Sequence, residues 1–144
     1  MAGAVLSLVI PGIPVAKGRP RLSTINGQAR AFTPAKTRKY EDLIRQAGAD
    51  AMAGRDLLEG ALAVEVRAYV AMPQSLKGKK REAAIEGTLR PTTRPDVDNY
   101  AKVIDGLNGI AWRDDAQVAT LIVTKHYSER PRLELSAEEI GGAA

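Results

Sequence analysis

Two aspartates separated by one residue are the side chains in this chain best suited to chemistry. They are Asp96 and Asp98, in the segment RPDVDN at residues 94–99. Pro95 biases the chain before it toward an extended conformation, and in an extended segment Asp96 and Asp98 point to the same side. Carboxylates held this close repel each other unless a cation lies between them. Because hard divalent cations prefer oxygen ligands, the spacing predicts a metal site.

A lysine is expected beside this pair. Apolar residues recur at helical spacing after Asp98, which predicts a helix over residues 99–107 with one buried side. Lys102 follows Asp98 by four residues, so the two side chains share a helix face. In phosphodiester hydrolysis a metal polarises the phosphoryl oxygen and lowers the pKa of the attacking water. A lysine at that place can neutralise the negative charge that develops.

A second pair of acids, Asp114 and Asp115, stands just before a predicted strand. The loop that returns from the helix can bring one of them beside Asp96 and Asp98, which would complete an oxygen-only site. Each feature also has an ordinary structural interpretation. Asp98 can be a helix N-cap, Lys102 can form a surface ion pair, and the two later aspartates can form a turn.

Composition excludes several other kinds of site. The 144 residues include no cysteine and a single histidine, His126, so thiolate zinc sites, cysteine nucleophiles and poly-histidine sites are ruled out. A bound metal must therefore have oxygen ligands, which favours Mg²⁺ with Mn²⁺ as a substitute. A serine triad is implausible because His126 lies in the middle of a predicted strand. No organic cofactor is indicated.

The charge of the chain is unevenly distributed. The net charge is +4, and residues 17–45 hold eight basic side chains but only two acids. A basic surface next to an acidic group suits a protein that holds a polyanion and cuts it with a metal. The residues that we expect to contact DNA phosphates are Lys17, Arg19, Arg21, Arg30 and Arg94. The first turns of the helix that begins near Pro34 also carry basic residues, which oppose the helix dipole and suggest an external anion.

The predicted elements form one domain over residues 1–140, with a disordered tail at 141–144. Strands are expected over residues 4–10, 62–70, 117–127 and 132–136, and the last two are expected to form a hairpin. Helices are expected from residue 33, over 75–86 and over 99–107, and residues 11–32 form a long basic loop or a loose hairpin. In the first helix, residues Tyr40, Leu43, Ile44, Ala47 and Ala51 form the expected buried stripe. This order indicates an α+β fold in which helices pack on a mixed or antiparallel sheet.

Several motifs taken together resemble those of the RusA family of Holliday-junction resolvases. The first is RPDVDNxxK over residues 94–102, the second is DxLNG over 105–109, and the third is WxDDAQV over 112–118. The stretch IPGIPVAKGRPR at residues 10–21 is similar to the phage-type branch of that family, as is TPxxTxxY at 33–40. The resemblance covers roughly residues 8–136.

The resemblance implies a Mg²⁺- or Mn²⁺-dependent endodeoxyribonuclease that acts as a homodimer on four-way DNA junctions, in recombination and repair. Asp96 and Asp98 match the metal-binding pair, Lys102 the catalytic lysine, and Asp115 the third acid, with Asp114 as the alternative. A two-fold dimer suits a junction with approximate two-fold symmetry. No apolar run is long enough to span a membrane, and we expect a cytoplasmic protein encoded by a bacterial host or a phage.

Two other functions stay open at this point. One is a flap or branched-DNA endonuclease with loose structural preference, and the other is a DNA-binding phage protein without catalysis. Carboxylates that face DNA without a metal would repel phosphate, which disfavours the second. Metal dependence of binding and of cutting separates the two.

Overall fold

The computed structural model of the chain describes residues 3–16, 21–25, 27–32 and 35–141. Its strands are β1 (Val5–Pro11), β2 (Arg21–Ile25), β3 (Gln28–Phe32), β4 (Leu62–Ala71), β5 (Val118–Ser128) and β6 (Arg132–Glu139). Its α-helices are α1 (Ala35–Met52), α2 (Lys79–Glu86) and α3 (Val97–Ala101), and two short 3₁₀ helices are η1 (Lys102–Leu107) and η2 (Asp115–Gln117).

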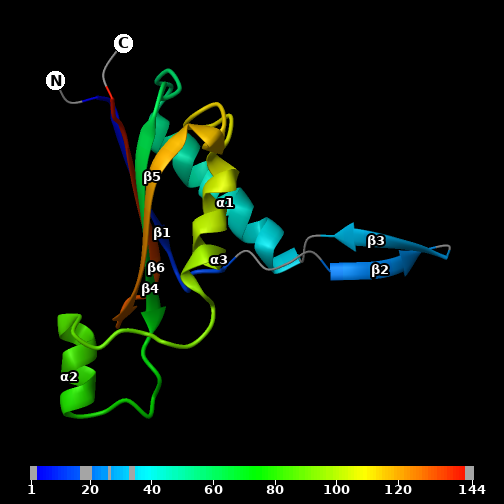
Figure 1. Cartoon of the computed structure of the whole chain (residues 1–144). Helices are drawn as coiled ribbons and strands as arrows, with labels where there is room; N and C mark the ends of the chain where they lie inside the picture. Colours follow the sequence, from blue (N-terminus) through cyan, green and yellow to red (C-terminus); the bar gives the residue numbers. More distant parts are fainter. Residues whose placement is uncertain (1–2, 17–20, 26, 33–34, 142–144) are drawn as a thin grey trace.

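Four strands form one mixed sheet in the order β1-β6-β4-β5. β6 is antiparallel to both of its neighbours, and β4 runs parallel to β5. Helix α1 and the continuous α3–η1 segment cover one face of the sheet, while α2 lies near one end of it (Figure 1). The predicted α+β class is therefore confirmed, and the sheet is mixed.

The predicted hairpin between the last two strands is wrong. β4 lies between β5 and β6, so the turn after Ser128 passes the end of β4 and the chain returns on its other side. The span across one intervening strand is roughly 10 Å, which a few extended residues can cover. The short turn suggested a hairpin, but the central place of β4 is a long-range property that local turn signals do not contain.

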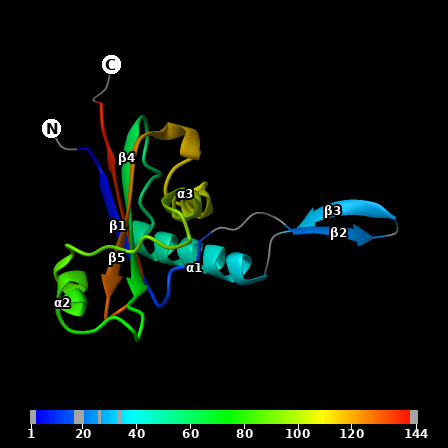
Figure 2. The ribbon, with the colours of Figure 1, turned by 60° about the horizontal axis from the view of Figure 1, so that its bottom comes forward.

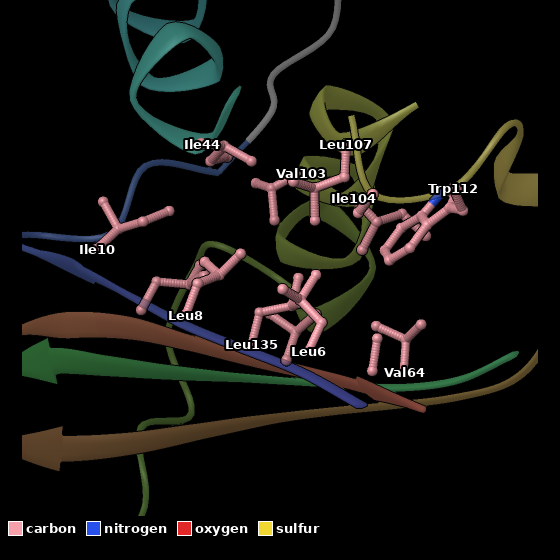
Figure 3. Close-up of a cluster of buried hydrophobic side chains, with 14 of the residues drawn as sticks. Leu6, Leu8, Ile10, Ile44, Val64, Val103, Ile104, Leu107, Trp112 and Leu135 are labelled. Carbon is pink, nitrogen blue, oxygen red and sulfur yellow. The ribbon is translucent and has the colours of Figure 1, made fainter. Parts of the chain in front are cut away.

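The core lies between the sheet and its helix layer (Figure 3). Every second residue of β1, β4 and β6 points into it, as the alternating burial of these strands shows. The predicted buried side of the 99–107 segment is confirmed, because Tyr100, Val103, Ile104 and Leu107 are all buried. In α1, Tyr40 and Ile44 are buried as predicted.

Leu43 departs from the predicted stripe of α1, since it is 53% exposed. The buried residues of this helix are Thr37, Tyr40, Ile44, Gly48 and Met52. They recur every three or four residues, and this stripe leaves position 43 facing outward. Gly48 belongs to it because η1 approaches closely: a Cβ atom there would clash with Leu107 Cδ2.

β2 and β3 form a separate two-stranded antiparallel ribbon. The ribbon stands away from the four-stranded sheet in both views (Figures 1 and 2). The hairpin alternative for residues 11–32 is thus confirmed over residues 21–32. The expected cap Thr33, the expected first helical residue Pro34, and residues 142–144 of the expected tail lie outside the described residues. Within the described part, no helix is long and apolar enough to cross a membrane.

Candidate active site

The first acid pair lies at the start of α3. Asp96 occupies the N-cap position with an extended backbone (φ −72°, ψ 156°), and Asp98 follows in the first turn. The helix begins at Val97, so residues 96–98 are not extended and the alternation argument for a shared side does not apply. The Asp96 side chain makes no capping hydrogen bond, and both carboxylates are exposed. Asp96 therefore forms no side-chain cap, and Asp98 does not occupy the cap position that a purely structural role would give it.

Lys102 is exposed and follows Asp98 by four residues along the continuous α3–η1 segment. Its Nζ lies 3.4 Å from Asn99 Oδ1, to which it donates a hydrogen bond. Asp105 follows Lys102 by three residues, which is one turn of the 3₁₀ helix η1. Asp98, Lys102 and Asp105 therefore follow one another along one side of the segment.

The second acid group lies where η1 meets η2. The Asp115 side chain shares hydrogen bonds with Asp105 first and with Asp114 second, and these carboxyl neighbours raise the pKa of Asp115 to about 6. The pKa of Asp114 is lowered, mainly because its carboxylate accepts a hydrogen bond from the backbone N–H of Ala116. One proton is thus held more tightly here than an isolated aspartate would hold it.

Asp114 also has a structural task. It is the N-cap of η2, with Oδ1 accepting from the Ala116 N–H at 2.9 Å, and Gln117 completes a capping box. Gln117 Nε2 in turn donates to the carbonyl oxygens of Leu58 (3.2 Å) and Gly60 (3.1 Å). These bonds fix η2 to the chain segment before β4. Asp115 is not the cap of η2, and its side chain contacts the carboxyl groups of Asp105 and Asp114 instead.

The two acid groups lie at different heights of the same segment. Seven residues separate Asp98 from Asp105, which corresponds to a rise of roughly 12 Å along α3 and η1. In the described part of the chain, no three acidic or histidine side chains converge closely enough to hold one metal ion. Asp115 thus lies beside Asp105 and Asp114, whereas Asp96 and Asp98 are near each other in sequence at the start of α3.

The loop before α3 is held by a lysine of β5. Lys125 Nζ donates to the carbonyl oxygens of Thr93 at 2.9 Å and Pro95 at 3.1 Å. An open cavity of about 470 Å³ lies at this loop, lined by Arg94, Pro95, Asp96 and Asn99. The Asp96 side chain therefore borders a space that is accessible to a large ligand and is also lined by an arginine.

Of the residues expected to bind DNA, Arg94 is exposed and lines this cavity. Arg21 and Arg30 fall in β2 and β3, at register positions opposite Phe32 and Ser23. Lys17 and Arg19 lie outside the described residues. The structure thus places one expected DNA contact next to Asp96 and two in the ribbon.

Two aromatic residues, Trp112 and His126, are held by contacts within the fold. Trp112 is fully buried, with Nε1 donating to Asn108 Oδ1 at 3.0 Å, so it belongs to the core. His126 stacks on Tyr69 with ring centroids 4.9 Å apart, and its Nε2 lies 2.8 Å from Thr124 Oγ1. Burial lowers the pKa of His126. Its place on the sheet agrees with a satisfied histidine.

Asp105 and Lys125 are site neighbours that the sequence interpretation did not assign. Asp105 had a signal, since it lies seven residues after Asp98 and three after Lys102, at helical spacing. Lys125 had none, because it lies in a strand 30 residues after Pro95 and meets the loop only through the fold.

Comparison with known proteins agrees with this architecture. A family model described as Endodeoxyribonuclease RusA matches residues 11–138. The chain therefore belongs to the RusA family of endodeoxyribonucleases, enzymes that act on branched DNA. It is also 41% identical over 138 residues to "Uncharacterized protein YqaN" of Bacillus subtilis (strain 168), and the match covers 94% of this chain and 96% of that protein.

Proposed function

We propose that this protein is a metal-dependent endonuclease that resolves four-way DNA junctions by paired phosphodiester hydrolysis. The observation that supports the proposal is the exposure of Asp96, Asp98 and Lys102 along the start of α3 and η1, where the Asp96 side chain forms no capping hydrogen bond. These groups have the chemistry that hydrolysis of a phosphodiester needs, namely metal ligands and a cation. Family membership supports the DNA substrate.

We propose that Asp96 and Asp98 hold a Mg²⁺ ion, for which Mn²⁺ can substitute. Mg²⁺ in nucleic-acid enzymes is often held by one or two carboxylates, with water and substrate phosphate as its other ligands. Two exposed carboxylates beside an open cavity fit that requirement. When bound, the ion supplies Lewis-acid polarisation of the phosphoryl oxygen and a more acidic attacking water.

The protein's own residues then have distinct roles. Lys102, one turn after Asp98, stabilises the negative charge that develops as the water oxygen attacks phosphorus and the bond to the leaving oxygen breaks. Asp115 is the third acid in our proposal, because Asp114 is engaged as the cap of η2. Its raised pKa suits a group that takes a proton near neutral pH.

The DNA is held by the basic residues around this site. Arg94 contacts phosphate at the cavity beside Asp96, and Arg21 and Arg30 contact it along the ribbon. Lys17 and Arg19 supply further phosphate contacts in our proposal. A two-stranded β-ribbon fits into the major groove of DNA. Phosphate contacts of this kind give affinity and position without reading sequence, as a structure-selective enzyme requires.

Two coordinated incisions in the two like strands of a junction need two active sites, so we propose a homodimer. The candidate surface is β5, an edge strand of eleven residues. Its residues 119–122 are exposed, with Leu121 at 40% and Ile122 at 51%. An apolar edge of this length can pair with another strand, and antiparallel pairing of two β5 strands would satisfy two-fold symmetry.

The function is tested by incubating the protein with a labelled synthetic four-way junction, beside matched duplex and flap DNA, in Mg²⁺, Mn²⁺ or EDTA. We expect symmetrical nicks on the junction and only with metal. Equal cutting of flaps would favour a branched-DNA endonuclease of loose preference. Binding without cutting in every metal condition would favour a non-catalytic DNA-binding protein.

A further inference from the structure

A second cavity, of about 540 Å³, lies at the base of the β2–β3 ribbon. The cavity is lined by residues 13–16, which precede the ribbon in the sequence, and by Lys36 and Thr37 at the start of α1, which follows the ribbon. The loop before α3 closes another side with Arg94 and Pro95, and these two residues also line the cavity at Asp96. The two cavities are therefore neighbours.

The charge of this cavity is one-sided. Lys36, Arg94 and Lys125 line it, and no acid stands among its described lining residues. Within the described part of the chain, none of the three has an ion-pair partner. Lys125 donates to two loop carbonyls, and because an ammonium group has three donors, one remains.

The N-terminal end of α1 adds to the positive potential. The first turn of α1 contains no acid but contains Lys36, although a helix N-terminus already carries partial positive charge. Within the described residues, no acid stands in this first turn or among the residues that line the cavity. A bound anion would compensate this positive charge, which answers the mismatch seen in the sequence.

Thr37 adds a hydroxyl group to the cavity wall. It is 6% exposed and is one of the polar residues that line the cavity. A hydroxyl oxygen can donate a hydrogen bond to a phosphate oxygen. Thr37 therefore adds a neutral donor to the three cations.

We infer that this cavity binds a backbone phosphate of the DNA strand next to the phosphate that is cut, through Lys36, Thr37, Arg94 and Lys125. The inference rests on the proposed nuclease function for its choice of substrate. A continuous strand that follows the ribbon would pass this cavity before it reaches Asp96. Lys125 then couples the two places, since the same ammonium binds the phosphate and holds the loop that carries Asp96.

The experiment measures binding of a labelled four-way junction and a labelled duplex in EDTA, between about 50 and 200 mM salt. The variants are Lys36→Ala and Thr37→Val, with Lys79→Ala of α2 as the matched control, because α2 lies away from α1 (Figure 1). We expect Lys36→Ala to weaken binding about fivefold to tenfold and to lower the salt slope by about one. Thr37→Val should weaken binding by a smaller factor with an unchanged slope.

A second arm identifies the bound phosphate. Single phosphates on either side of the cut are replaced in turn by an uncharged methylphosphonate. At one position the replacement should weaken wild-type binding but should not weaken Lys36→Ala binding further, because both changes remove the same contact. Inorganic phosphate, compared with chloride at equal ionic strength, tests whether a free anion occupies the cavity instead.

The inference is overturned if Lys36→Ala and Lys79→Ala bind alike, or if inorganic phosphate displaces DNA better than matched chloride. Because binding is measured without metal, the result does not depend on cleavage. A lowered salt slope in a protein that never cuts junctions would remove the proposed function and keep the cavity. If the wild type cuts junctions but Lys36→Ala leaves the salt slope unchanged, the proposed function stands and the cavity is not a phosphate site.

Discussion

The four aspartates of the candidate site differ in their electrostatic surroundings. Asp96 and Asp98 are exposed at the start of α3, whereas Asp115 shares hydrogen bonds with two other carboxyls. Asp114 is committed to a backbone N–H as a helix cap. Residue type alone would treat these acids as equivalent, and their neighbours assign them different tasks.

The first residue-scale prediction concerns Asp98→Asn. We expect a loss of junction cleavage of roughly 100- to 1,000-fold, since a ligand for the metal is removed from a site that acts electrostatically. Junction binding at low salt should be kept or strengthened, because one negative charge near phosphate is gone. Gel assays of cutting and binding measure both, with exposed Asp56→Asn as the control. Equal loss in both variants, or unfolding of Asp98→Asn, would count against the site.

The second prediction concerns pH and Asp115. Its folded pKa is about 6 against an ordinary 3.8, so between these values the folded state holds more protons than the unfolded state. Stability should therefore fall as pH rises through this window and stay lowered above it. Asp115→Asn should remove that fall and should match the wild type below the window. Thermal unfolding of the wild type and of Asp115→Asn, measured at steps from acidic to neutral pH, tests this prediction. If stability depends on pH in the same way in both proteins, the shared proton is contradicted.

At the scale of elements, the position of α3–η1 depends on its packing against α1. Gly48 of α1 faces Leu107 and Ile110, and Gly106 of η1 faces Ile44, with Ile44 Cγ2 3.2 Å from the place of a Cβ. These small residues let the two helices approach closely. This close packing fixes how far the α3–η1 segment, with Asp98, Lys102 and Asp105, lies from the sheet.

We predict that Gly48→Ala destabilises the fold by about 1–3 kcal/mol, because the new methyl overlaps buried Leu107. Alanine is the better helix former by about 1 kcal/mol, so a purely local effect would stabilise. Urea unfolding measures the difference. Exposed Asp50→Ala in the same helix should change stability by less than about 0.5 kcal/mol. A stabilised Gly48→Ala protein would contradict the close packing.

The sequence predicts features that depend on neighbouring residues better than features that depend on long-range contacts. The buried sides of β4 and of residues 99–107 follow from period-two and helical spacing, so they were predicted well. The hairpin between β5 and β6 was predicted wrongly, because strand order depends on contacts across the whole sheet. Lys125 was missed for the same reason, and Asp105 was missed although its helical spacing from Asp98 was available.

The whole molecule is a sheet with α1 and the α3–η1 segment on one face, α2 near one end, and the β2–β3 ribbon standing away from it (Figure 2). The candidate acids lie on the α3, η1 and η2 segments and not on the ribbon. Such a shape can hold DNA on the ribbon while the strand to be cut reaches Asp96. In the proposed function one copy supplies one active site, so we expect paired cutting to depend on assembly.

We predict that the wild-type protein has twice the 15.4 kDa mass of one chain in solution. Ile122→Lys, which puts a charge on the exposed β5 edge, should give the single-chain mass. Val5→Lys on the opposite edge strand, β1, should leave the mass unchanged, although Val5 is equally exposed at 52%. Light scattering after gel filtration measures all three. A monomeric wild type would contradict the dimer, and monomers from Val5→Lys alone would move the interface to β1.

The most direct test of the central claim uses a supercoiled plasmid with an extruded cruciform, incubated with the protein and Mg²⁺. Paired cuts across the junction convert the circle to a linear molecule in one binding event, whereas single unpaired cuts leave a nicked circle. We predict linear product that requires the metal and disappears in Asp98→Asn. Nicked circles alone, or linear product that Asp98→Asn still forms, would contradict it.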